Sequence, residues 1–138
     1  MKRNLILLLI FVLVLMGGMY GYYQWNRGPQ DMNSAKVDLA MDASALYSEF
    51  VADEAKANEK YLDKVILVKG AVSSVDKSNG QVVIMFDTGD PMGGVLCELD
   101  SYSKHDITEF VEGEIVTLKG TCSGKISDVQ ISRCVLVK

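Results

Sequence analysis

The apolar run near the start of the chain restricts the fold more than any other feature. From Leu5 to Tyr23, 19 consecutive residues carry no charge, which is close to the roughly 20 that a helix needs to cross the hydrocarbon core of a bilayer. Lys2 and Arg3 precede the run, and tyrosines and a tryptophan cluster at its far end, where amphipathic rings favour the headgroup region. We therefore predict a transmembrane signal anchor over residues 1–27.

Two alternatives are a cleaved signal peptide and a buried core helix. A signal peptide has a shorter apolar region and a small-residue cleavage site, whereas this run ends in glycines set among Met and Tyr. A lipoprotein signal needs a cysteine just after the run, and the first cysteine is Cys97. Because basic flanks favour the inside, we expect a single-pass protein of the cell membrane. Met1 would then lie in the cytoplasm, and everything after residue 27 in the periplasm or outside the cell.

The charge of the expected outer part differs from that of the whole chain. Three of the 14 basic residues precede residue 28, so 11 Lys and Arg remain there against 18 Asp and Glu. The cations are single residues scattered among more numerous carboxylates. Nucleic-acid binders use clustered Lys and Arg to neutralise phosphates, so this composition disfavours general nucleic-acid binding.

Residues 28–41 contain Gly-Pro and Asn-Ser and have no sustained period, which is typical of a flexible stalk. Next, apolar residues at helical spacing predict one helix over about 43–61, with charged residues on its other faces. Glu49, Asp53 and Glu54 are interpreted as part of a solvated face, with a metal or partner site as the alternative.

From residue 64 the apolar period changes to two, the period of a half-buried strand. Five such runs follow, and a loop with a possible short helix around 103–110 separates the third from the fourth. This pattern matches a five-stranded Greek-key barrel of the OB type. We therefore predict a mainly β OB-fold domain with a leading helix over residues 42–138. The five runs are VILVKGAVSSV, QVVIMF, GVLCEL, EIVTLKGTC and SDVQISRCVLVK.

The run VILVKGAVSSV at 65–75 has a near echo in IVTLKGTCSGK at 115–125. In an OB barrel the first and fourth strands are long and bent, and a glycine inside a strand removes the side chain where backbones come close. Gly70 and Gly120 are therefore interpreted as bend points. The alternative is that Lys-Gly simply ends an exposed strand.

A helix signature and a strand motif together carry a family resemblance. They comprise Leu46, Tyr47, Phe50, Asp53, Glu54, Ala57, Asn58 and Tyr61, the Gly-x-Cys-x-Gly motif at 120–124, and Asp128-Val129. With this set, residues 43–137 resemble the tRNA-anti-like family of OB-fold proteins, small exported or membrane-anchored bacterial proteins without an established biochemical role. The resemblance implies the fold and the location, while a shared fold does not carry function with it. The chain departs from many relatives in lacking a lipobox cysteine.

The candidate binding residues follow from how OB barrels hold single strands, with aromatic platforms on the second and third strands beside a basic groove. Here those strands supply one aromatic ring and no cation. Lysines in or next to the echoed runs could still line one side of the barrel. The resulting strip is Lys69, Lys77, Phe86, Lys119 and Lys125, with solvated strand ends and a core position for Phe86 as alternatives.

Candidate catalytic groups are few. MFDTGD at 85–90 is similar to the catalytic turn of aspartic proteases, but Asp, Gly and Pro favour a plain loop turn. His105, with Asp106 and Glu109, is interpreted as a surface histidine, because metal sites usually recruit more nitrogen or sulfur ligands. No nucleophile is paired with a base. We therefore expect no enzyme activity, no catalytic residues and no cofactor or metal.

Three cysteines in an exported domain suggest one disulfide and one remaining thiol. Strand alternation points Cys97 and Cys122 inward and leaves Cys134 out of phase. If a bridge forms, we expect it between Cys97 and Cys122; the alternative is that buried thiols act as small hydrophobes.

Taken together, these features favour a membrane-anchored OB-fold binding module outside the cytoplasm. Its membrane contact would be the N-terminal helix, and its partner a protein, a peptide or a glycan. The alternative is an OB domain that binds single-stranded nucleic acid or tRNA, which the acidic composition disfavours.

Overall fold

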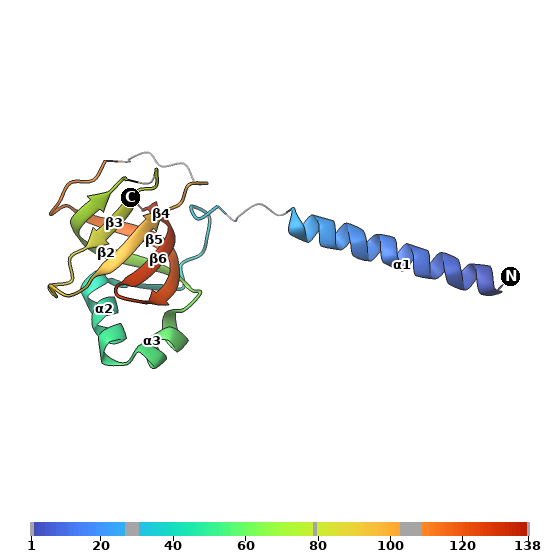
Figure 1. Cartoon of the computed structure of the whole chain (residues 1–138), viewed down its shortest axis with the longest axis horizontal. Coiled ribbons are helices and arrows are strands. Elements are labelled where there is room, and N and C mark those ends of the chain that lie inside the picture. The colour runs from blue at the N-terminus through green and yellow to red at the C-terminus, as the bar shows by residue number, and fades with distance from the viewer. Residues whose placement is uncertain (1, 27–30, 79, 103–108, 138) are drawn as a thin grey trace.

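The computed structural model describes residues 2–26, 31–78, 80–102 and 109–137. Helix α1 (Lys2–Trp25) is continuous and stands apart from the folded domain (Figure 1). Its stretch Ile6–Trp25 has a mean hydropathy of 2.1, and none of it is buried by the rest of the protein. One N-terminal helix is therefore long and apolar enough to span a membrane, as predicted.

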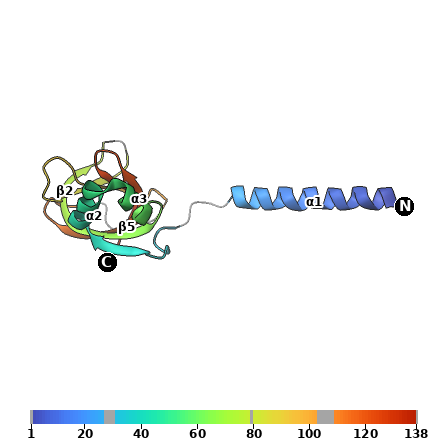
Figure 2. The same cartoon turned by 90° about the horizontal axis from the view of Figure 1, so that it is seen from below.

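The domain is a closed five-stranded barrel, which confirms the predicted fold. Its strands follow the order β2-β3-β4-β6-β5, and β5 pairs back onto β2 to close the ring (Figure 2). Only the β4–β6 pair within the barrel is parallel, and the other pairs are antiparallel. The strands are β2 (Val65–Asp76), β3 (Val83–Phe86), β4 (Val95–Leu99), β5 (Ile115–Lys125) and β6 (Val129–Leu136).

The predicted helix over 43–61 is in fact two helices, α2 (Ala43–Ala52) and α3 (Glu54–Tyr61), which cover one end of the barrel (Figures 1 and 2). Asp53 breaks the helix with an extended backbone, and its carboxylate accepts a hydrogen bond from the Lys56 N–H at 3.1 Å. Aspartate is a favoured N-cap residue because it satisfies an otherwise unpaired backbone donor. The apolar period continues across the break, so periodicity alone could not reveal it.

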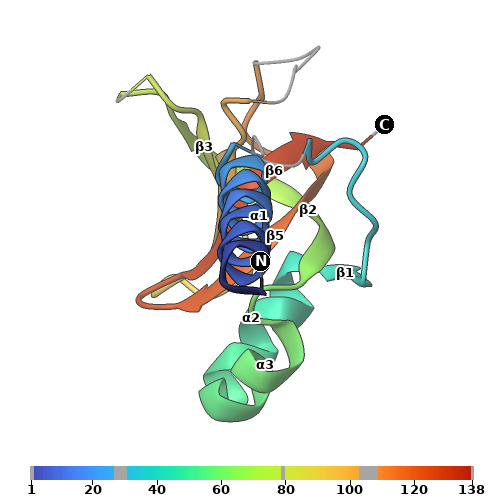
Figure 3. The same ribbon diagram turned by 90° about the vertical axis from the view of Figure 1, so that its right-hand side faces the viewer.

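Part of the segment predicted to be a stalk forms a strand. β1 (Leu39–Asp42) pairs in parallel with β2, with Leu39 opposite Ile66, and lies along the outside of the barrel (Figure 3). Just before it, the Asp38 carboxylate accepts a hydrogen bond from the Val65 N–H at 3.0 Å. The structure thus differs from the predicted flexible stalk over these residues.

Residues ahead of β1 are also held against the barrel, by Lys119. Its side chain is buried, and Nζ donates to the carbonyl oxygens of Asn33 at 2.9 Å and Ala35 at 3.0 Å. Met32 and Ala35 are buried in a small apolar cluster with Val135. We call residues 31–38 the strap, because their contacts bind them to β2, β5 and β6.

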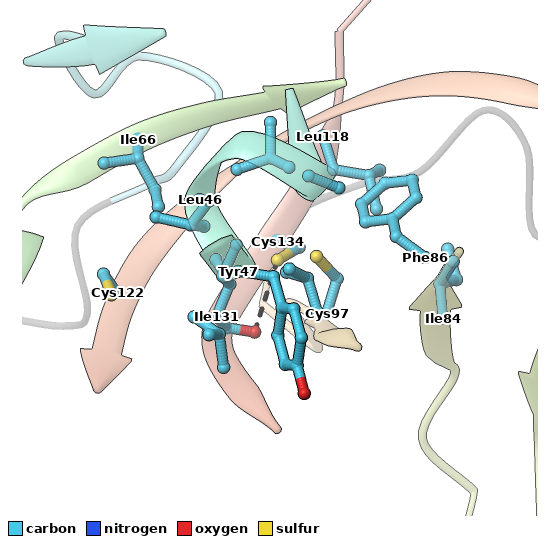
Figure 4. Close-up of a cluster of buried hydrophobic side chains, with 14 of the residues drawn as sticks. Leu46, Tyr47, Ile66, Ile84, Phe86, Cys97, Leu118, Cys122, Ile131 and Cys134 are labelled. Carbon is cyan, nitrogen blue, oxygen red and sulfur yellow. Dashed lines mark hydrogen bonds between the residues drawn. The ribbon is translucent and has the colours of Figure 1, made fainter. Parts of the chain in front are cut away.

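The core fills the barrel and the space under α2 and α3. Helix residues Leu46, Phe50 and Tyr61 are at most 1% exposed, and Figure 4 shows Leu46 and Tyr47 projecting among strand side chains. Fully burying a large apolar side chain stabilises a fold by about 1.5–3 kcal/mol, so the helices are integral to the domain. The strand residues with which they share the core include Ile66, Val68, Ile84, Phe86, Leu118 and Ile131.

The glycines of the two Lys-Gly pairs, Gly70 and Gly120, lie where other atoms pack closely against the strand. A Cβ on Gly70 would lie 3.0 Å from the Ala43 Cβ and 3.0 Å from a Phe86 ring carbon. A Cβ on Gly120 would lie 2.7 Å from the Cys134 Sγ and 2.9 Å from the Ser132 carbonyl oxygen. The β5–β6 register also shifts between Lys119 and Thr121. Both glycines therefore serve close approach, as predicted, and Gly120 lies at an irregularity in its strand.

The cysteines agree with the alternative that buried thiols act as small hydrophobes. All three are free thiols and all are buried, and Cys97 and Cys122 point inward as alternation predicted. Cys134 was expected out of phase, but Arg133 has a φ of 56°, a left-handed conformation that is uncommon outside glycine. This residue breaks the alternation and turns Cys134 into the core.

Candidate functional site

The lysine strip expected from the sequence is not assembled. Lys119 is committed to the strap, and Phe86 is 1% exposed in the core. Lys77 directly follows Asp76, the last residue of β2. Lys125 lies beyond the other end of β2, because the first residue of that strand, Val65, pairs with Thr121 of the antiparallel strand β5. Lys77 and Lys125 therefore lie toward opposite ends of β2, Lys119 is buried, and Phe86 offers no stacking face to a base.

The other groups singled out in the sequence have structural roles or lie elsewhere. Glu49 accepts hydrogen bonds from Lys60 Nζ at 2.8 Å and Tyr61 Oη at 2.7 Å, so it joins α2 to α3. His105 and Asp106, with most of the possible helix around 103–110, lie outside the described residues. Within the part of the chain that is described, no group of three or more His, Cys, Asp or Glu could hold a metal ion.

The β3–β4 connection, residues 87–94, is an ordered loop that we call the aspartate loop. Asp87 Oδ1 accepts a hydrogen bond from the Gly89 N–H at 2.8 Å, and Asp90 Oδ1 accepts one from Met92 N–H at 2.9 Å. The Thr88 hydroxyl donates to the Gly93 carbonyl at 2.9 Å. Short Asp side chains favour such turns because they satisfy nearby backbone donors. MFDTGD is therefore a loop turn, as the sequence favoured.

A residue distant in the sequence fixes the far end of this loop. Asp128, in the β5–β6 turn, accepts a hydrogen bond from the Gly94 N–H at 2.8 Å. The backbone contact continues with the Val129 N–H donating to the Gly94 carbonyl at 3.0 Å. The loop is thus held by its own aspartates and by the neighbouring turn.

Two hollows flank the aspartate loop. One, which we call the acidic groove, has a volume of about 640 Å³, and its lining includes Met85, Asp87, Asp90, Met92 and Asp128. The bonds described above use only Oδ1 of Asp87 and Asp128, and their Oδ2 atoms have no hydrogen-bond partner among the described residues. These carboxylates can therefore still accept donors from a ligand.

The second hollow, which we call the apolar hollow, lies between the loop and α2. Its volume is about 500 Å³, and its lining includes Tyr47, Val51, Ala52 and Pro91. Val51 is 58% exposed, although it lies on a helix whose other face is in the core. The two hollows share residues 88–91, so one ligand could contact carboxylates on one side of the loop and apolar groups on the other.

Tyr47 connects the loop to the helix beneath it. A Cβ on Gly93 would lie 2.5 Å from the Tyr47 hydroxyl oxygen, so glycine is needed there for close approach. Burial raises the pKa of Tyr47, and the Asp90 charge and its hydrogen bond to the hydroxyl raise it further. The hydroxyl therefore stays protonated at neutral pH and points its hydrogen toward Asp90.

The sequence predicted that the aspartate loop is a turn, but it did not predict that the loop lines a candidate binding site. The signal was the density of Asp and Gly in DTGDPMGG, which also holds one Met, and the exposed Val51 on helix α2. The partner Asp128 could be connected with this loop only through the barrel topology, because 34 residues separate it from Gly94.

Comparison with known proteins places the chain in a family. The family model described as tRNA_anti-like matches residues 1–136. The chain belongs to the tRNA_anti-like family. No curated protein matches it.

One solved structure shares the fold of this tRNA_anti-like protein. It is described as a "putative nucleic acid-binding lipoprotein" from Klebsiella pneumoniae subsp. pneumoniae MGH 78578. The similarity has a TM-score of 0.59 at 18% identity and covers 80% of this chain and 100% of that one. Family and fold together support an OB-fold binding module.

The residues that carried the family resemblance have clear roles in the structure. Asp53 caps α3, Gly120 leaves room for Cys134, and Asp128 holds the aspartate loop. Most of the others are core residues: Leu46, Tyr47, Phe50, Ala57, Tyr61, Cys122 and Val129. In this tRNA_anti-like chain the signature thus stabilises the barrel and, through Asp128, supports the site.

Proposed function

We propose that this tRNA_anti-like protein is a non-enzymatic binding module, anchored in the cell membrane with its barrel outside the cytoplasm, whose partner is a cationic peptide segment of a protein. The acidic groove is the observation that carries the proposal. Asp87, Asp90 and Asp128 line it together with Met85 and Met92. Carboxylates accept charge-assisted hydrogen bonds from Lys and Arg, and Met adapts to varied apolar surfaces.

The surroundings of the groove favour a peptide that also carries an apolar side chain. Met92 is 87% exposed and Val51 58% exposed, on the two sides of the loop. An apolar residue next to a Lys or Arg would bury this surface while the cation meets the carboxylates. The net negative charge of the domain would speed the encounter with such a partner at low salt.

Nucleic acid is the second candidate, because the solved structure with the shared fold carries that description. The site geometry weighs against it. Three carboxylates would repel phosphates, Phe86 is buried away from stacking, and Lys119 is engaged with the strap. Lys69 and Lys77 are exposed but lie outside the acidic groove.

The test compares ligands on the full-length protein in detergent micelles. Fluorescence anisotropy would follow a labelled peptide of alternating Lys and Leu, an otherwise matched peptide of Glu and Leu, and a single-stranded oligothymidine. We expect binding of the Lys-Leu peptide, weaker binding as salt rises, and none of the other two. Binding of the oligothymidine in preference to the Lys-Leu peptide would replace the proposal with its alternative.

Charge-neutralising variants locate the binding surface. Asp87→Asn keeps an oxygen that can accept the Gly89 N–H while it removes the charge, so the turn should persist. We expect it to weaken Lys-Leu binding about three- to tenfold, on the scale of one charge-assisted hydrogen bond. Glu59→Gln on exposed α3 removes the same charge away from the groove and serves as the matched control. Equal effects of the two variants would show only a general electrostatic attraction.

A further inference from the structure

Two buried thiols meet in the barrel where its parallel strands pair. Cys97 lies on β4 opposite Ile131 of β6, and the next paired position joins Leu99 to Cys134. Both side chains are 0% exposed. Figure 4 draws the sulfur atoms of Cys97 and Cys134 facing each other, with Cys122 farther away, and after burial the proximity of Cys97 helps to raise the pKa of the Cys134 thiol.

The backbone of β6 departs from regular strand geometry to place Cys134 there. Arg133 has a φ of 56°, and the β4–β6 register shifts between Cys97 and Leu99. A non-glycine residue in a left-handed conformation is sterically disfavoured and persists only when its surroundings require it. The strand thus turns a cysteine toward a second cysteine.

Gly120 on β5 supplies the room for this thiol. Its missing Cβ would lie 2.7 Å from the Cys134 Sγ, and any side chain there would push the sulfur away. The Cys134 thiol also donates to the Ile131 carbonyl at 3.4 Å. Cys134 is therefore directed by the strand beneath it as well as by its own backbone, and the contact with Cys97 is built into three strands.

We propose that Cys97 and Cys134 form a structural disulfide during maturation of the domain; the inference rests on the proposed location outside the cytoplasm, where disulfides persist. Each thiol loses one hydrogen as the S–S bond forms. The two electrons and two protons reduce the disulfide of an exported thiol–disulfide oxidoreductase to a dithiol, through a mixed disulfide with one of the two cysteines. Because both thiols are inaccessible in the folded barrel, the exchange precedes the docking of β6.

The experiment traps thiols in intact cells that make the full-length protein. Acid quenching and alkylation with a maleimide are followed by proteolysis without reduction and by mass spectrometry. We expect the peptides that contain Cys97 and Cys134 to be linked and lighter by two hydrogens, with Cys122 alkylated. The Cys122→Ala variant, a matched control, should keep the same link.

A separate topology measurement keeps the two proposals distinguishable. If a protease added outside the cytoplasm degrades the barrel, then alkylation of all three thiols, or a link that includes Cys122, overturns the disulfide. If the barrel is instead cytoplasmic, the proposed location fails. The pairing is then judged by refolding the full-length protein in micelles with oxidised and reduced glutathione. A Cys97–Cys134 link supports it, and any other result overturns it.

Discussion

The Asp128 carboxylate accepts a hydrogen bond from the Gly94 N–H at 2.8 Å, and so joins the β5–β6 turn to the residue before β4. We predict that Asp128→Ala lowers the free energy of unfolding by about 1–3 kcal/mol, because it leaves a partly buried N–H without a partner. Urea denaturation of the full-length protein in micelles would measure it. Asp128→Asn keeps an acceptor and should recover most of the loss. Equal losses in both variants would contradict the hydrogen bond as the cause.

The close approach of Gly93 to Tyr47 provides a second prediction. Gly93→Ala should destabilise the domain by about 1–3 kcal/mol, because the new methyl group overlaps the Tyr47 hydroxyl. In a Tyr47→Phe background the same substitution should cost less, since the oxygen that it meets is absent. A double-mutant cycle measures this coupling. Strict additivity of the two substitutions would show that the contact is not the source of the effect.

The strap depends on a buried ammonium group. Lys119→Met should cost about 1–3 kcal/mol, because the carbonyls of Asn33 and Ala35 lose their donor. Hydrogen exchange at residues 31–38 should become faster while the barrel core stays protected. Lys69→Met, at an exposed position on β2, is the matched control and should leave exchange in the strap unchanged.

The Glu49 contacts predict a pH-dependent effect. Hydrogen bonds from Lys60 and then Tyr61 hold the pKa of Glu49 below its ordinary value of 4.5. A lowered pKa in the folded state stabilises the fold above the ordinary pKa, and this stabilisation is lost as the pH falls through the folded value. Since Glu49 is 43% exposed, solvent screening keeps the effect below about 1 kcal/mol.

Glu49→Gln should therefore be less stable than the natural protein near pH 7, and the difference should shrink as the pH drops below 4.5. Urea midpoints at several pH values would follow it. Glu59→Gln is again the control for the removal of one exposed charge from α3. A gap between Glu49→Gln and the natural protein that widens in acid would contradict the assignment.

The barrel was predictable because its strands obey simple alternation. β2 and β4 bury every second residue over much of their length, and the glycines at 70 and 120 mark close packing. Two departures from the predicted fold, the inward position of Cys134 and the break between α2 and α3, were not predictable, because neither follows from the apolar period. Arg133 adopts a left-handed conformation without being glycine, so alternation assigned Cys134 to the wrong side. Asp53 ends one helix and begins the next within an unbroken apolar period.

The candidate site was harder to predict than the fold. The lysines were grouped by their positions in repeated motifs, yet the barrel separates Lys77 from Lys125 and buries Lys119. The acidic groove combines the aspartate loop with Asp128, from a turn far along the chain. Such a juxtaposition depends on which strands become neighbours, and one-dimensional patterns do not encode it.

The hydrogen bonds from Lys119 to the carbonyls of Asn33 and Ala35 also limit the distance between the barrel and helix α1. Helix α1 ends at Trp25 and the first buried strap residue is Met32, and covalent geometry limits the six residues between them to a span of at most roughly 20 Å, about 3.6 Å per residue. With α1 in a bilayer, this limit would keep the barrel within a shallow layer next to the headgroups.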